Sequence, residues 1–141
     1  LHETGQIPDI QTAFQKYIGD HCSCYVPREK VTPYEAIDLI HSAGGLAILA
    51  HPLLYHLSAD NLKKLVLDLK EHGLNGLEAI YSTYTAGEER EMKQLAESVG
   101  LAISGGSDFH GANKPSIHLA TGKGKLLIPY SVLEKLKDLP K

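Results

Sequence analysis

The sequence predicts an α/β fold in which short buried strands alternate with amphipathic helices. Apolar runs at residues 46–50, 76–81 and 101–104 are separated by two helical patterns, at a spacing of roughly 25 residues. This order predicts a parallel sheet or part of a (β/α) barrel. Residues 1–31 are helical and irregular instead, so we expect two domains: a cap-like element at 1–31 and the α/β part at 32–141.

The first expected helix covers residues 8–18. Its apolar residues share one face, Pro8 lies near its first turn, and Gly19 follows its end. Thr32-Pro33-Tyr34-Glu35 matches a capping box, which predicts a second helix that stops at Gly44-Gly45.

The α/β part follows with its own start and stop signals. Residues 46–50 predict a strand buried on both faces, and Ser58 is placed to cap a helix that ends at His72-Gly73. Residues 76–81 predict the second strand, and residues 88–99 predict a helix that Gly100 ends. Residues 101–104 predict the third strand. We further expect a fourth strand over 117–121 and a short terminal helix around 132–136.

Composition narrows the class of protein. A chain of 141 residues with 43% hydrophobic and 22% charged residues has the composition of a globular domain. The net charge of −3 argues against an extended nucleic-acid surface but leaves room for a small basic pocket. No apolar run is long enough to span a membrane, and Cys22 and Cys24 lie too close together to form a disulfide framework, so we expect a cytoplasmic protein. Met92 is the only methionine, which predicts that this chain is part of a longer one.

Two strand ends carry the candidate chemistry. His51 follows the first strand, and Asp108-Phe109-His110 follows the third strand with glycines on both sides. In an extended segment, Asp108 and His110 would point to one side while Phe109 turns into the core. A carboxylate with imidazoles forms the ligand set of Zn²⁺, Mn²⁺ or Fe. The alternative is that His51 and Asp108 only cap a strand and a turn.

Other polar residues give weaker signals. His41 and His72 lie near helix C-termini, where a structural role is expected. Residues 122–125, Gly-Lys-Gly-Lys, lack the spacing of a P-loop. Lys114 follows the Asp-x-His loop and is a candidate for binding an anionic substrate, with a solvated loop lysine as the alternative. No residue is identified as a catalytic acid or base.

Three segments resemble motifs of the PHP (polymerase and histidinol phosphatase) superfamily. They are Gly44–Pro52 with its Ala-His-Pro end, Gly76–Ser82, and Ser107–Gly111 with its Ser-Asp-x-His core. Within the superfamily, the chain is similar to the TrpH-like metal-dependent phosphoesterases. This resemblance implies the C-terminal part of a distorted (β/α)7 barrel, preceded by the end of a helical insertion at residues 1–31.

The resemblance also implies a chemistry. His51, Asp108 and His110 would be metal ligands in a centre of two or three divalent ions, Mn, Zn or Fe. A hydroxide activated by the metals would hydrolyse a small phosphorylated substrate, such as a nucleotide or the 5′ end of a short RNA.

The chain departs from the family pattern in one major respect: the early His-x-His motif is absent. We therefore expect a fragment that is inactive alone and whose unpaired strand edges favour a dimer. A smaller departure is Ala120, where relatives often carry glycine. An amidohydrolase-type metal hydrolase and a non-catalytic module are the alternative functions.

Overall fold

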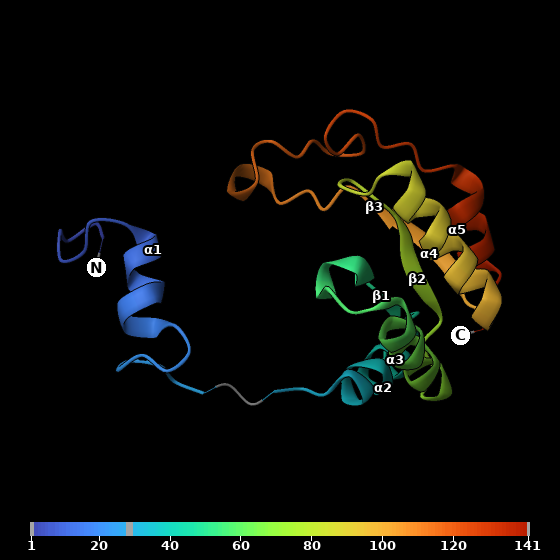
Figure 1. Ribbon diagram of the computed structural model, residues 1–141, viewed down its shortest axis with the longest axis horizontal. Coiled ribbons are helices and arrows are strands. Elements are labelled where there is room, and N and C mark those ends of the chain that lie inside the picture. Colours follow the sequence, from blue (N-terminus) through green and yellow to red (C-terminus); the bar gives the residue numbers. More distant parts are fainter. Residues whose placement is uncertain (1, 28–29, 141) are drawn as a thin grey trace. The chain divides into compact units, whose positions relative to one another are not determined.

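The computed structural model describes residues 2–27 and 30–140, and the chain divides into two compact units, Leu1–Val31 and Thr32–Lys141. Figure 1 shows the course of the chain and its element labels. That the first unit is the end of a helical insertion stays a prediction. In the described part of the chain, every helix is too short or too polar to cross a membrane.

The first unit is built on one short helix. Helix α1 (Ile10–Ala13) continues as the wider π-helical turn η1 (Phe14–Ile18) and ends at Gly19. The Asp9 carboxylate accepts a hydrogen bond of 2.6 Å from the backbone N–H of Thr12, so the helix begins two residues after Pro8. The Cys22 thiol donates to the carbonyl of Gln15 over 3.3 Å, which fastens the irregular segment to the helix.

Three α-helices of the second unit begin at residues whose side chains satisfy free backbone N–H groups. Thr32 and Glu35 form the expected capping box of α2 (Pro33–Ser42), and Ser58 caps α3 (Ala59–Glu71). Helix α4 (Ala86–Val99) begins earlier than expected because Thr85 and Glu88 form a second capping box. Helix α5 (Tyr130–Lys137) is the terminal helix.

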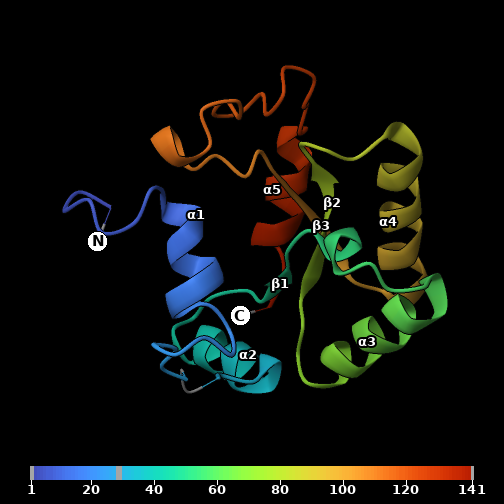
Figure 2. The ribbon, with the colours of Figure 1, turned by 60° about the vertical axis from the view of Figure 1, so that its left-hand side comes forward.

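The sheet has three parallel strands in the order β1-β2-β3, as Figure 2 shows from a second direction. They are β1 (Ile48–Leu49), β2 (Gly76–Tyr81) and β3 (Ala102–Gly106). Strand β1 is shorter than the predicted 46–50, and the backbone turns into the left-handed region at His51, two residues after its end, with φ 34°. The α/β prediction with a parallel sheet is confirmed.

The core lies between the sheet and its helices. Leu77 and Ala79 of β2 are fully buried, and they belong to one cluster with Val66 of α3 and with Met92 and Ala96 of α4. Helix α4 packs on β2 and β3, and α5 packs on β3. The apolar residues whose spacing predicted the helices are thus the residues that hold the sheet.

Two short helical turns, η2 (Pro52–Tyr55) and η3 (Gly111–Asn113), lie in the loops after β1 and β3. Two local predictions for the segment after β3 are wrong. Residues 117–121 form no strand; His118 and Gly122 pair across a turn in which Ala120 has φ 67°. Phe109 does not enter the core but is 47% exposed. The cause is Asp108, whose φ of 58° breaks the extended conformation on which the alternation depended.

Candidate metal centre

The candidate site lies at the edge of the sheet where all three strands end. Because the strands are parallel, their C-terminal ends meet at one edge, where α/β proteins place their ligands. His51 comes two residues after β1, Tyr81 is the last residue of β2, and Asp108 comes two residues after β3. The edge therefore gathers residues from three distant parts of the sequence.

Asp108 is the centre of the hydrogen bonds at this edge. Its Oδ2 accepts from the Tyr81 hydroxyl over 2.9 Å and from the Lys114 ammonium over 2.6 Å. These bonds favour the charged form, so Lys114, followed by Tyr81, lowers the pKa of the Asp108 carboxyl group. The carboxylate is therefore ionised at neutral pH, as a metal ligand must be.

Tyr81 is a donor that keeps its proton. Burial, together with the hydrogen bond to the charged Asp108, raises the pKa of Tyr81 to about 12. The hydroxyl thus donates at any pH near neutrality and fixes the orientation of the carboxylate.

His110 is oriented by the backbone of Asp108. Its Nδ1 lies 2.7 Å from the Asp108 carbonyl oxygen and 3.3 Å from Oδ1 of the same residue. A carbonyl oxygen only accepts, so Nδ1 carries the proton in this contact. The lone pair of the neutral ring is then on Nε2, which is the arrangement common among metal-binding histidines.

His51 is held from its backbone rather than from its ring. Its N–H donates to Oε2 of Glu78 over 2.8 Å, and its ring lies 5.6 Å from the Tyr81 ring, centroid to centroid. The ring atom Nδ1 is buried and makes no hydrogen bond to any described residue. A buried nitrogen without a partner is costly, and a ligand at this position would remove that cost.

Glu78 is the residue at this edge that the sequence reasoning missed. The pairing of β2 with β3 shifts between Glu78 and Ile80, so Ala79 is an extra residue in a β-bulge. The other carboxylate oxygen, Oε1, lies 2.7 Å from where a Cβ on Gly106 would be, so this glycine makes room for it. Burial, opposed by the bond from His51, raises the pKa of Glu78. The sequence did contain one signal for this residue, because Glu78 is the one acidic residue within an otherwise apolar strand.

Backbone strain is concentrated at the same edge. His51 and Asp108 both have φ in the left-handed region, at 34° and 58°. Non-glycine residues rarely adopt this conformation, and where they do the surrounding structure must hold them in place. Here the bonds from His51 to Glu78 and from Tyr81 and Lys114 to Asp108 do so.

The structure brings the predicted site residues together in part. Asp108 contacts His110 and Lys114 directly, whereas His51 is linked to Asp108 through Tyr81. Among the residues that the structure describes, no three His, Cys, Asp or Glu side chains converge closely enough to hold an ion. The assignment of His51, Asp108 and His110 as metal ligands therefore stays a prediction.

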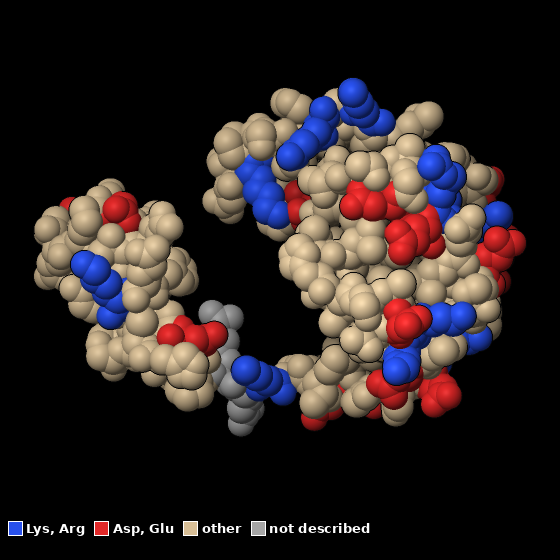
Figure 3. All heavy atoms as spheres, in the orientation of Figure 1, with Lys and Arg blue, Asp and Glu red and all other residues tan. Residues whose placement is uncertain are grey.

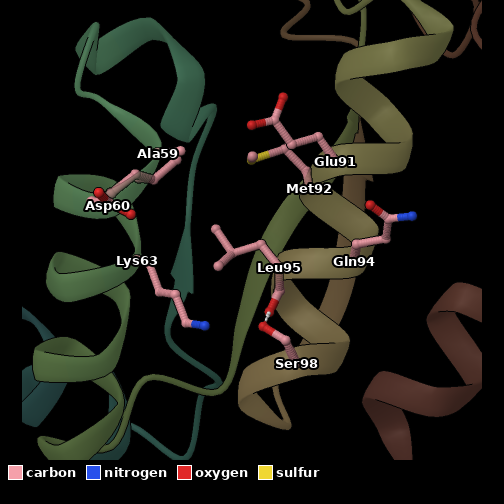
Figure 4. A pocket seen from close by; sticks show the side chains of 9 residues that line it. Ala59, Asp60, Lys63, Glu91, Met92, Gln94, Leu95 and Ser98 are labelled. Carbon is pink, nitrogen blue, oxygen red and sulfur yellow. Dashed lines mark hydrogen bonds between the residues drawn. The ribbon is translucent and has the colours of Figure 1, made fainter.

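A separate groove of about 300 Å³ lies between α3 and α4. Figure 4 shows Met92 and Leu95 facing Lys63 across it, with Asp60 and Glu91 nearby. It contains none of the residues predicted for the site, and its charges are of both signs. We therefore locate the candidate site at the strand ends and not in this groove.

No family model matches the chain. Curated relatives do: the chain is 37% identical over 132 residues to the 5′-3′ exoribonuclease Rnm of Escherichia coli, covering 94% of this chain and 44% of the relative. It is 31% identical over 110 residues to the 3′,5′-nucleoside bisphosphate phosphatase of Chromobacterium violaceum, covering 78% and 40%. The chain thus spans less than half of the length of these relatives.

Two solved structures are similar to the fold. A Bifidobacterium adolescentis protein described as a metal-dependent phosphoesterase has a TM-score of 0.64 and 25% identity, over 96% of this chain and 46% of that one. A Chromobacterium violaceum protein described as an amidohydrolase, with bound sulfate, has a TM-score of 0.61 and 30% identity, over 81% and 40%. With these relatives and with its Ala-His-Pro and Ser-Asp-x-His motifs, the chain belongs to the PHP superfamily.

Proposed function

We propose that this chain carries part of the active site of a metal-dependent phosphoesterase that hydrolyses nucleotides or the 5′ ends of short RNA. Its curated relatives include an exoribonuclease and a nucleoside bisphosphate phosphatase, and a structural neighbour is described as metal-dependent. The sheet would be the C-terminal part of a distorted (β/α)7 barrel, and the relatives' greater length leads us to place further ligands outside these 141 residues.

The observation that carries this proposal is the arrangement around Asp108. An ionised carboxylate, an imidazole with a free Nε2 and a buried imidazole nitrogen without a partner lie at one strand-end edge. This set of donors fits a divalent ion such as Mn, Zn or Fe. His51, Asp108 and His110 would hold one or more of the two or three ions.

The chain's own residues prepare this edge for the reaction. When bound, a divalent ion supplies Lewis acidity toward phosphoryl oxygens and lowers the pKa of coordinated water to about 7. Tyr81 keeps Asp108 oriented and charged, and Glu78 holds the backbone of His51 in its left-handed conformation. Lys114 places an ammonium 2.6 Å from Asp108, where it would bind a phosphate oxygen of the substrate.

Metal binding to the 141-residue chain tests the site. We expect weak binding of Mn²⁺ by isothermal titration calorimetry, at least tenfold weaker after Asp108→Asn, and little hydrolysis of a nucleoside 3′,5′-bisphosphate by the chain alone. Asp68→Asn is the matched control, because Asp68 on α3 is a partly exposed carboxylate that bonds Tyr34 rather than residues of the edge. Equal affinity in both variants would refute the assignment and leave the module as non-catalytic.

The neighbour described as an amidohydrolase supports a second candidate, hydrolysis of a C–N bond. Both activities need a metal at the strand ends, so the substrate decides between them. A protein that carries this chain together with its barrel partner segments should cleave a nucleoside phosphate and leave a cyclic amide intact. The opposite preference would favour the amidohydrolase.

A further inference from the structure

The loop between β3 and α5 has a charge unlike that of the rest of the molecule. From Phe109 to Leu133 the sequence contains Lys114, Lys123 and Lys125 but no Asp or Glu, while the whole chain has a net charge of −3. We call residues 109–129 the basic segment. Figure 3 shows Lys and Arg side chains gathered over this segment, at the strand-end side of the second unit.

The basic segment is fixed beside the candidate site. Gly122 lies so close to Ser82 that a Cβ there would overlap the Ser82 hydroxyl, and this hydroxyl donates to the carbonyl of Ser107 over 2.5 Å. Ser107 precedes Asp108 in the chain. Two further residues hold the segment. Ile117 is buried, and the side chain of Ile128 lies 3.1 Å from where a Cβ on Gly105 would be.

The other two lysines of the basic segment lie close in the chain to this anchored glycine. Lys123 follows Gly122 directly, and both Lys123 and Lys125 are exposed. Within the described ranges, neither forms an ion pair, unlike Lys114, which is bonded to Asp108. Residues two apart are separated by at most about 7 Å along the chain, a separation that suits neighbouring phosphates of an extended strand.

An exposed aromatic ring lies next to the same site. Phe109 follows Asp108 and is 47% exposed, because the left-handed conformation of Asp108 turns the chain away from the core. An exposed aromatic ring next to positive charge is the combination by which proteins bind single-stranded nucleic acids, since bases stack on the ring and phosphates meet the cations.

We propose that the basic segment binds a single strand of RNA, with Phe109 stacking on a base near the 5′ end and Lys123 and Lys125 contacting phosphates further along. The inference rests on the proposed function, which places the 5′ phosphate at Asp108. It extends that function, because this segment would make the protein prefer a strand to a mononucleotide. Two lysines would contact only a short stretch of the strand, and the net charge of −3 likewise favours a small basic site over an extended one.

The test is fluorescence anisotropy of the 141-residue chain with a 5′-phosphorylated octaribonucleotide that carries a dye at its 3′ end. EDTA is present, so binding is measured without hydrolysis. Each lost phosphate contact lowers the slope of log affinity against log salt by about 0.7 for a single strand. Lys123→Ala/Lys125→Ala should therefore lower the slope by about 1.4, which makes the loss of affinity between 50 and 200 mM salt about sevenfold smaller.

Phe109→Leu should act differently, because it removes stacking but no charge. Its affinity should fall about fivefold or more while the salt slope stays unchanged. The control is Lys63→Ala/Lys64→Ala, which removes the same charge from exposed positions on α3 and should leave the slope as in the wild type. Circular dichroism confirms that each variant is folded.

Three results would overturn the proposal: no binding by the wild type at 50 mM salt, equal slopes in the two double-lysine variants, or full affinity in Phe109→Leu. A failure of the proposed function is distinguishable from these. It would appear as an absence of Mn²⁺-dependent hydrolysis by the longer protein, with the binding pattern of the three variants intact.

Discussion

The sheet and the helices packed on it form what we call the body of the second unit. Here Leu77 and Ala79 are fully buried in regular structure, and the exposed fraction of Met92 is 1%. At the strand-end edge, by contrast, His51 and Asp108 adopt left-handed backbone conformations and are held by a few polar contacts. The body derives its stability from apolar area removed from water. The edge is strained, so substitution of a candidate ligand there, such as Asp108, should alter metal binding more than folding.

The largest expected effect is on stability, and it distinguishes a buried leucine of the body from an exposed one. Leu77→Ala should lower the free energy of unfolding by about 3 kcal/mol or more, because it leaves a cavity in a fully buried position. Leu67→Ala on α3 is the control, since Leu67 is 41% exposed and its truncation should cost about 1 kcal/mol or less. Urea denaturation measures both, and equal losses would contradict the assignment of the core.

The next prediction tests how tightly the basic segment packs beside the edge. Gly122→Ala should destabilise by about 2–4 kcal/mol, because φ is 57° and the new Cβ would overlap Ser82. Gly124 also has a positive φ, 94°, but nothing lies within 4 Å of where its Cβ would be, so Gly124→Ala should cost only about 1 kcal/mol of strain. Thermal unfolding of the two variants compares them directly. Similar losses would mean that the contact with Ser82 contributes nothing.

A pH profile tests the link between Tyr81 and Asp108. The pKa of Tyr81 is about 12 in the folded chain against 10.0 for an ordinary tyrosine. The folded state therefore binds more protons between these values, so this contribution is complete below pH 10 and is lost as pH rises through 12. Tyr81→Phe should cost about 1.5–3 kcal/mol at pH 7 and should show a shallower decline above pH 10. Parallel profiles for both proteins would show that this hydrogen bond is not formed.

A smaller effect concerns the end of a helix in the body. Thr85→Ala should lower the free energy of unfolding by about 1 kcal/mol, because it removes the capping box of α4. Thr83→Ala, at an exposed turn position, provides the comparison and should change stability by less than about 0.5 kcal/mol. Neither change should affect Mn²⁺ binding. A change in metal affinity in Thr85→Ala would show that body and edge are coupled through α4.

The smallest effect is a gain. Ala120→Gly should raise the free energy of unfolding by about 0.5–1 kcal/mol, because φ at Ala120 is 67° and glycine adopts this conformation without strain. Differential scanning calorimetry resolves a shift of this size. A loss of stability would indicate that the methyl group makes a contact worth more than the strain.

The same contrast explains what the sequence could predict. The capping box at Thr32 and Glu35, the glycine stop at Gly100 and the apolar spacing of α3 are local signals, and the structure confirms all three. The α/β order and the parallel sheet followed from them. The body was therefore predictable because its rules act over a few residues.

The edge was less predictable because its geometry depends on distant partners. The conformation of Asp108 is held by Tyr81 and Lys114, so the alternation expected of residues 108–110 failed and Phe109 became exposed. Glu78 was missed because its significance lies in a bond to His51, 27 residues away. The residue types at the strand ends gave the candidate site, but no local pattern gave its geometry.

The β-bulge at Ala79 has a consequence for how this edge can change during evolution. In a regular strand, residues three apart point to opposite faces, yet Glu78 and Tyr81 both serve the surroundings of His51. Because Ala79 is an extra residue between them, Glu78 and Tyr81 lie on the same side of the strand. If the strand became regular with Ala79 still present, the side chains of Glu78 and Tyr81 would lie on opposite sides of it. A relative that lost the bulge in this way would keep every polar residue of the edge but would lose their arrangement around His51.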